Sequence, residues 1–251
     1  MYFDSYGKDD ERPAVVLLHG LSFDRRQWEP VLDELAIIDP DRRVVAFDLP
    51  GHGKSPARDS YQLDEVAAVV HQAVTAAGLD APIVAGHSLG GALATVYAAR
   101  YPARGVINID QPLLVGGFRD VLRGAASVLR SPGYGQVWDG MLAGMGIERL
   151  PVDAQELVRA AGTPPQELLL GYWDEIMTMS AEEFTRRRTH DMATLRMKGI
   201  AYHYVGGNDL EPRYRNWLKW VLPEVTVTVL PGGGHFPHLA HPAELAKILA
   251  G

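Results

Sequence analysis

A short apolar strand, a sharp turn carrying a serine and an alanine-rich helix follow one another between residues 82 and 101. The turn reads Gly86-His87-Ser88-Leu89-Gly90. A serine on such a strand-to-helix turn is held in a strained backbone conformation that exposes its hydroxyl. Glycines are expected at 86 and 90 because strand and helix approach too closely there for a side chain. The start of the helix adds free N–H groups that face a developing negative charge.

Composition is consistent with a globular enzyme-sized chain. Of 251 residues, 47% are hydrophobic, which is enough for a substantial core. There is no cysteine, so disulfides, a thiolate nucleophile and cysteine metal sites are excluded. The formal net charge of -7 argues against a nucleic-acid partner, and no apolar run is long enough to span a bilayer. Without a signal-peptide pattern, we expect a cytoplasmic protein with a small-molecule substrate and no membrane contact, either a monomer or a homodimer.

Short apolar runs alternate with helical patterns along most of the chain. Strands are predicted at residues 14–18, 44–47, 83–85, 106–109, 200–205 and 225–230, and helices at 26–37, 63–77, 89–101, 214–221 and after Pro242. This alternation predicts an α/β fold: a mostly parallel, twisted sheet of seven or eight strands with helices on both faces. Helical patterns without a strand fill residues 112–198. We predict that they form an inserted helical cap, with the core built from residues 1–111 and 199–251.

Two loops downstream of Ser88 supply a base and an acid. Gly206-Gly207-Asn208-Asp209 follows one predicted strand, and Gly232-Gly233-Gly234-His235 follows the next. Because the carboxyl ends of parallel strands meet at one edge of the sheet, these side chains are expected near the serine. We predict Ser88 as nucleophile, His235 as base and Asp209 as the acid that orients the base. Asp110, at the end of another strand, is the alternative acid, or it caps the first turn of the cap.

The loop His19-Gly20-Leu21-Ser22 and the cap are expected to complete the site. The N–H groups of Leu21 and Leu89 are predicted to form an oxyanion hole. His19 is expected to brace the loop. The predicted substrate pocket consists of Ser22, Trp138, Met141, Tyr172, Trp173, Met177 and Phe236. For any one of the cap side chains, packing of the cap on the core is the favoured interpretation, and a place in the pocket is the alternative. Arg186-Arg187-Arg188 is interpreted as a solvated helix face, with attraction of an acidic substrate as the alternative.

Two patterns suggest other chemistry and are set aside. His235, His238 and His241 are three residues apart, but Pro237 and Pro242 prevent one helix from aligning the rings on a metal. Gly51-His52-Gly53 lacks the third glycine of a nucleotide-binding loop. We therefore expect neither a metal nor a cofactor.

Five pieces in order resemble the α/β-hydrolase fold superfamily over almost the whole chain. They are His19-Gly20, the turn at residues 48–55, Gly86-His87-Ser88-Leu89-Gly90, Asp209 and Gly234-His235. The resemblance implies a Ser–His–Asp site between core and cap that uses no cofactor. A serine at position 88 differs from the haloalkane dehalogenases and epoxide hydrolases, which use aspartate there. The short N-terminal segment also implies that the first of the usual eight strands is missing, and Ala240 stands where members often carry a glutamate.

Three functions are compatible with these patterns. The first is a serine hydrolase that cleaves a carboxylic ester or lactone through an acyl-enzyme. The second is a lyase or carbon–carbon bond hydrolase in which the Ser–His pair moves protons; Arg213 or Arg215 facing a substrate carboxylate would favour it. The third is a hormone-receptor-like binding protein on the same scaffold.

Overall fold

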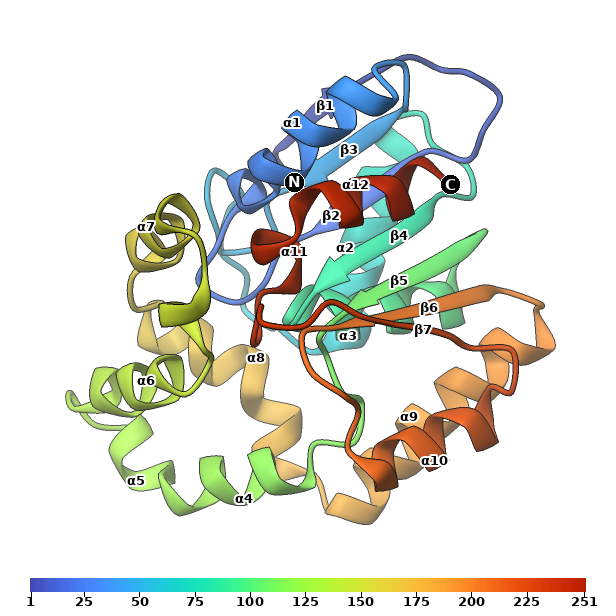
Figure 1. Cartoon of the computed structure of the whole chain (residues 1–251). Coiled ribbons are helices and arrows are strands. Elements are labelled where there is room, and N and C mark those ends of the chain that lie inside the picture. Colours follow the sequence, from blue (N-terminus) through green and yellow to red (C-terminus); the bar gives the residue numbers. More distant parts are fainter.

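Seven strands form one sheet in the computed structural model, which describes residues 1–251. The order across the sheet is β1-β3-β2-β4-β5-β6-β7 (Figure 1). The strands are β1 (Phe3–Tyr6), β2 (Val15–Leu18), β3 (Val44–Phe47), β4 (Ile83–His87), β5 (Gly105–Ile109), β6 (Ala201–Gly206) and β7 (Thr226–Val229). All neighbours pair in parallel except β1 with β3. The predicted fold class is confirmed.

The edge strand β1 was not expected from the sequence. It pairs antiparallel with β3, Phe3 opposite Phe47 and Tyr6 opposite Val44. Its side chains are largely exposed, and the mixed polar and aromatic pattern of four residues gives no periodic signal. Its place in the sheet therefore depends on the buried neighbour β3.

Helices cover both faces of the sheet (Figure 1). One face packs against α1 (Glu29–Ile38) and α12 (Pro242–Ala250), which also contact each other and follow η1 (Arg25–Trp28) and α11 (Pro237–Ala240) respectively. The other face packs against α2 (Leu63–Ala76), α3 (Leu89–Arg100) and α10 (Pro212–Val221). Strands buried on both faces explain the continuous apolar runs of β2, β3 and β4.

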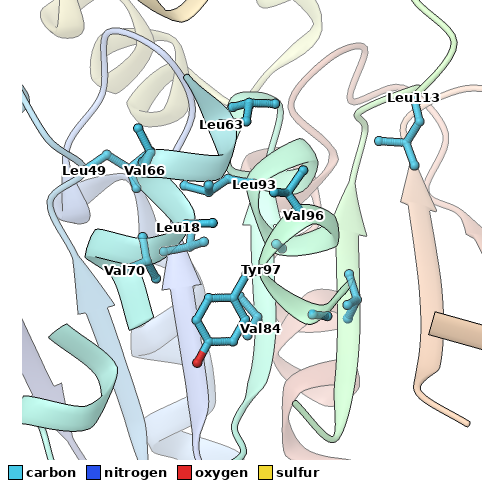
Figure 2. Close-up of a cluster of buried hydrophobic side chains, with 14 of the residues drawn as sticks. Leu18, Leu49, Leu63, Val66, Val70, Val84, Leu93, Val96, Tyr97 and Leu113 are labelled. Carbon is cyan, nitrogen blue, oxygen red and sulfur yellow. The ribbon is translucent and has the colours of Figure 1, made fainter. Parts of the chain in front are cut away.

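The larger core lies between the sheet and helices α2 and α3, where Figure 2 shows their side chains meeting. Leu18 and Val84 come from neighbouring strands, Val70 from α2, and Leu93 and Tyr97 from α3. All five are completely buried. This packing fixes α3, and with it the serine turn at its start, against the sheet.

Between β5 and β6 the chain is entirely helical. The elements are α4 (Gly116–Gly124), α5 (Ala126–Leu129), α6 (Tyr134–Ala143), η2 (Ile147–Arg149), α7 (Val152–Ala161), α8 (Gln166–Thr178) and α9 (Ala181–Met197). In Figure 1, α4 to α8 gather beyond one end of the sheet, at the side where β4 and β5 end. We refer to residues 112–180 as the cap.

Helix α9, which the sequence placed in the cap, also packs outside residues 112–180. It contacts α3 and α10. Lys198, just after α9, donates hydrogen bonds to the carbonyl oxygens of Ala98 and Ala99, and Asp191 pairs with Arg100 of α3 at 2.9 Å. These contacts attach α9 to the layer of helices on the sheet. The predicted extent of the cap, residues 112–198, stays a prediction. No helix of the structure is long and apolar enough to cross a membrane.

Candidate active site

Ser88 lies at the junction of β4 and α3 in a backbone conformation that is unusual for a residue with a side chain. Its φ is +52° and its ψ is −121°. A Cβ on Gly86 would clash with the carbonyl of Gly90, and a Cβ on Gly90 would clash with the carbonyl of Leu18. The two glycines therefore allow strand, turn and helix to cross closely, as predicted from the sequence. Strain of this kind persists only where the surrounding structure holds it.

His235 pairs with Asp110. The Nδ1 of His235 lies 2.8 Å from Oδ2 of Asp110, and the other carboxylate oxygen accepts a hydrogen bond from the Gly207 N–H at 3.1 Å. Asp110 has a φ of +51°, directly after β5. Both side chains are about one-fifth exposed, so they are shielded but reachable from the cavity described below. The hydroxyl of Ser88 has no side-chain hydrogen bond of its own, which is common for catalytic groups before substrate binds.

The structure contradicts the predicted pairing of His235 with Asp209. The Asp209 side chain is 87% exposed and lies 3.3 Å from Arg215 in a surface ion pair. The loop after β6 contributes the Gly207 N–H to the site in place of a carboxylate. The alternative acid, Asp110, occupies the position beside the imidazole.

Glycines explain why the histidine loop reaches past β6 to Asp110 at the end of β5. A Cβ on Gly207 would collide with the carbonyl of Gly234, so the loop carrying His235 lies directly on the end of β6. The same loop is held from the cap side, where the His235 N–H donates to the Met145 carbonyl at 2.9 Å. The glycine pair 206–207 was the signal in the sequence for this close crossing.

Two backbone N–H groups near Ser88 are free to bind an oxygen. Neither the Leu21 nor the Leu89 N–H donates a backbone or side-chain hydrogen bond within the protein, and both residues line the same cavity as Ser88. The Leu89 N–H is at the N-terminus of α3, where the helix dipole favours negative charge. The pair therefore has the character required of the predicted oxyanion hole.

A cavity of about 540 Å³ connects these groups with the cap. Its wall includes Ser88, Asp110 and His235 at one end, and 18 of its 33 lining residues are hydrophobic. Among the residues predicted for the substrate pocket, those that line it are Trp138, Met141, Tyr172, Trp173 and Phe236.

Two of the predicted pocket residues do not line the cavity. Ser22 lies beyond the Leu21 N–H with a φ of +73°, which turns the chain away. Met177 is buried among the core residues on another side of α8. The two predicted carboxylate-binding candidates, Arg213 and Arg215, are exposed and also lie outside the cavity.

Comparison with known proteins identifies the family of this chain. Residues 15–248 match the sequence model of a family described as the alpha/beta hydrolase family. The chain belongs to this family. The predicted resemblance and the prediction of an α/β-hydrolase enzyme are thereby confirmed.

Each single relative either matches only part of this α/β hydrolase or shares few identical residues with it. RutD of Escherichia coli O127:H6, named as a carbamate hydrolase, is 37% identical over 95 residues, which cover 37% of this chain and 35% of RutD. The match thus spans about a third of that relative's length. An esterase from Thermogutta terrifontis superimposes with a TM-score of 0.79 at 19% identity, covering 99% of this chain and 91% of the esterase. An enol-lactonase from Burkholderia xenovorans LB400 gives 0.79 at 17% identity, with 99% and 94% covered. At these identities the two structures establish the fold alone.

A chain of buried hydrogen bonds in this α/β hydrolase links three loops that border the cavity, those of Leu21, Ser88 and His235. The Gly20 N–H donates to the Gln27 side-chain oxygen at 2.9 Å, and the Gln27 amide nitrogen lies 3.0 Å from Nδ1 of His87. The Nε2 of His87 lies 2.8 Å from the carbonyl oxygen of His235. Because Gln27 donates to Nδ1, the proton of a neutral His87 is on Nε2 and is donated to that carbonyl. Burial lowers the pKa of His87 well below its usual value, which keeps the ring neutral.

Replacing Gln27 by leucine is expected to reduce kcat about tenfold or more while the fold is retained. The change leaves the Gly20 N–H and Nδ1 of His87 without partners, which costs about 1–3 kcal/mol of folding free energy for each group. It also removes the link that holds the loop of Leu21 in place relative to the loop of His235. Activity is measured per active site, titrated with a serine-reactive probe. Gln155→Leu is the matched control, because Gln155 donates a comparable hydrogen bond to Leu150 within the cap. Equal kcat in the two variants would contradict a positioning role for Gln27.

Several histidines are buried and act as structural groups. His19 accepts a hydrogen bond from the Leu49 N–H at 2.9 Å, which braces the loop before Leu21. His238 is completely buried against Trp28 and His87, with no partner for either ring nitrogen. No group of three or more His, Cys, Asp or Glu side chains in the structure is arranged to hold a metal ion.

Proposed function

We propose that this protein is a serine hydrolase that cleaves a carboxylic ester or lactone of small to medium size through an acyl-enzyme. The observation that carries the proposal is the His235–Asp110 hydrogen bond of 2.8 Å at a cavity that Ser88 also lines. An esterase and an enol-lactonase share the fold, so the fold is compatible with this class of substrate. The largely apolar wall and the volume of about 540 Å³ suit an apolar acyl or aryl group.

In the proposed mechanism, Ser88 attacks the substrate carbonyl and His235 takes its proton through Nε2. Asp110 holds the imidazole with its proton on Nδ1 and stabilises the positive charge that forms. The N–H groups of Leu21 and Leu89 bind the oxyanion, a contribution of several kcal/mol to the transition state. His235 then protonates the leaving alcohol. Water, activated by the same imidazole, attacks the acyl-enzyme and releases the acid.

Labelling with a fluorophosphonate probe tests this proposal. The probe phosphonylates an activated serine, and we expect a stoichiometric mass increase that peptide mapping places on Ser88. The control is Ser88→Ala, which removes only the hydroxyl and is expected to give no label and no ester hydrolysis. Label on another residue, or full ester hydrolysis by Ser88→Ala, would overturn the proposal.

The lyase or carbon–carbon bond hydrolase is a second candidate, and one observation favours it. Arg188 lines the cavity, so an arginine is available for a substrate carboxylate although Arg213 and Arg215 are not. The two candidates differ in the covalent intermediate. A serine ester trapped by rapid acid quench and located on Ser88 by mass spectrometry would favour the ester or lactone hydrolase.

A further inference from the structure

An arginine is buried in the wall of the cavity. Arg188 of α9 is 2% exposed, whereas its neighbours Arg186 and Arg187 are exposed, so the predicted solvated face applies to those two alone. One of its terminal nitrogens, Nη2, lies 3.2 Å from Asp191. Its other two nitrogens, Nε and Nη1, have no hydrogen-bond partner. A buried guanidinium with two unpaired nitrogens is costly unless something else satisfies them.

The packing of α9 places Arg188 on the side of the cavity near the start of α3. Lys198 contacts the carbonyls of Ala98 and Ala99, while Asp191 lies beside Arg100, whose guanidinium also reaches back to the Val96 carbonyl. Residues nearer the N-terminus of α9 therefore lie nearer the N-terminus of α3. Arg188 precedes Asp191 by almost one helical turn. Ala92, which follows Ser88 by one turn of α3, lines the same cavity as Arg188. One continuous cavity thus joins the guanidinium and the nucleophile.

The carboxylates near Arg188 leave its Nε and Nη1 without an acceptor. Asp191 is shared, since it also pairs with Arg100 at 2.9 Å, and Arg100 pairs in addition with Asp64. Glu175 lines the same cavity, is 5% exposed and forms no ion pair with Arg188. Burial raises the pKa of Glu175, while the positive charge of Arg188 acts in the opposite direction, and Oε2 of Glu175 has no hydrogen-bond partner. The ring of Phe184 lies 5.5 Å from the guanidinium carbon of Arg188 and offers it no acceptor oxygen.

We propose that the cavity selects substrates whose acyl group carries a second acceptor oxygen away from the scissile carbonyl, bound by Arg188. The acceptor is a carboxylate or an amide carbonyl, and it accepts hydrogen bonds from the unpaired nitrogens of the guanidinium. This inference rests on the proposed function, since it describes the acyl group of the same reaction. The apolar wall between Ser88 and Arg188 contacts the methylene groups that join the two oxygen-bearing ends.

Three 4-nitrophenyl esters of matched length test the proposal: the hexanoate, the adipate hemiester and the 5-carbamoylpentanoate. The quantity measured is the ratio of kcat/KM for each oxygen-bearing ester to that for the hexanoate. A hydrogen bond to a charged group predicts a preference of roughly tenfold or more in the native protein. Whichever of the two esters gives the higher ratio identifies the acceptor as a carboxylate or as a neutral carbonyl. The ratio does not depend on the fraction of folded protein, because each oxygen-bearing ester and the hexanoate are measured on the same preparation.

Arg188→Met is expected to reduce this ratio to about one, since methionine keeps the apolar stem and removes all donors. Arg187→Met, an exposed change on the same helix, is the matched control and is expected to keep the native ratio. If Arg188→Met does not fold, Arg188→Lys keeps a charge but removes Nε and Nη1, and it is expected to lower the ratio. No preference in the native protein, or a preference retained in the Arg188 variant that folds, would overturn the proposal. Ser88-dependent hydrolysis of the hexanoate would still stand in that case, so failure here is distinct from failure of the proposed function.

Discussion

Asp110→Asn is expected to lower kcat/KM for an ester substrate about 10⁴-fold. One oxygen of Asp110 accepts from the Gly207 N–H, so an asparagine keeps its carbonyl oxygen there and turns its amide nitrogen toward His235. That nitrogen is a donor, which forces the imidazole proton onto Nε2. An imidazole in this tautomer cannot take the proton of Ser88. The measurement is steady-state hydrolysis with the concentration of folded enzyme determined by circular dichroism.

Asp209→Asn is the matched control and is expected to change kcat/KM less than about twofold. It removes an exposed ion pair with Arg215, and such surface pairs contribute about 0–1 kcal/mol. The pair of variants separates the two acids that sequence patterns leave open. A large loss in Asp209→Asn together with near-native activity in Asp110→Asn would show that the His235–Asp110 hydrogen bond is not the functional one.

Acid is expected to unfold this protein at a higher pH than its carboxylates alone would require. Burial lowers the pKa of His19 to about 4 and those of His52 and His238 to about 3, and that of His87 is lowered too. In the unfolded chain each titrates near 6.5, so below this pH the unfolded state binds more protons than the folded state. Stability therefore falls as pH decreases through this range, by about 1.4 kcal/mol per pH unit for each histidine. Together the four remove roughly 5 kcal/mol between pH 6 and pH 5, comparable to the whole stability of many domains.

Urea unfolding at pH values from 7.5 to 5 measures this effect. The dependence of the unfolding free energy on pH gives the number of extra protons that the unfolded state binds. His238→Met removes one buried ring and is expected to reduce that number by about one at pH 5. His190→Gln, at an exposed position, is the control and is expected to leave it unchanged. An uptake of less than one proton in the unmodified protein would contradict the argument.

The sequence was most informative where the structure depends on neighbours along the chain. The serine turn with Gly86 and Gly90 is local, because strand, turn and helix meet within a few residues. Buried parallel strands leave continuous apolar runs, and the more exposed β7 leaves an alternating one. Six of the seven strands were therefore predicted, and the fold class followed from their alternation with helices. The exposed edge strand β1 leaves no such run and was missed.

Tertiary contacts decided the features that depend on which distant surfaces meet. Asp110 and Asp209 both follow strands, and only the contact of Gly207 with Gly234 brings the histidine loop to one of them. Helix α9 carries three successive arginines, and its packing on α3 buries Arg188 in the cavity while its two neighbours stay in solvent. A residue type and its spacing fix what chemistry a side chain can perform, whereas burial and partners are set by the packing of elements far apart in the chain. The sequence by itself therefore determined the fold and the serine turn, and only the tertiary structure decided which carboxylate pairs with His235 and which arginine lines the cavity.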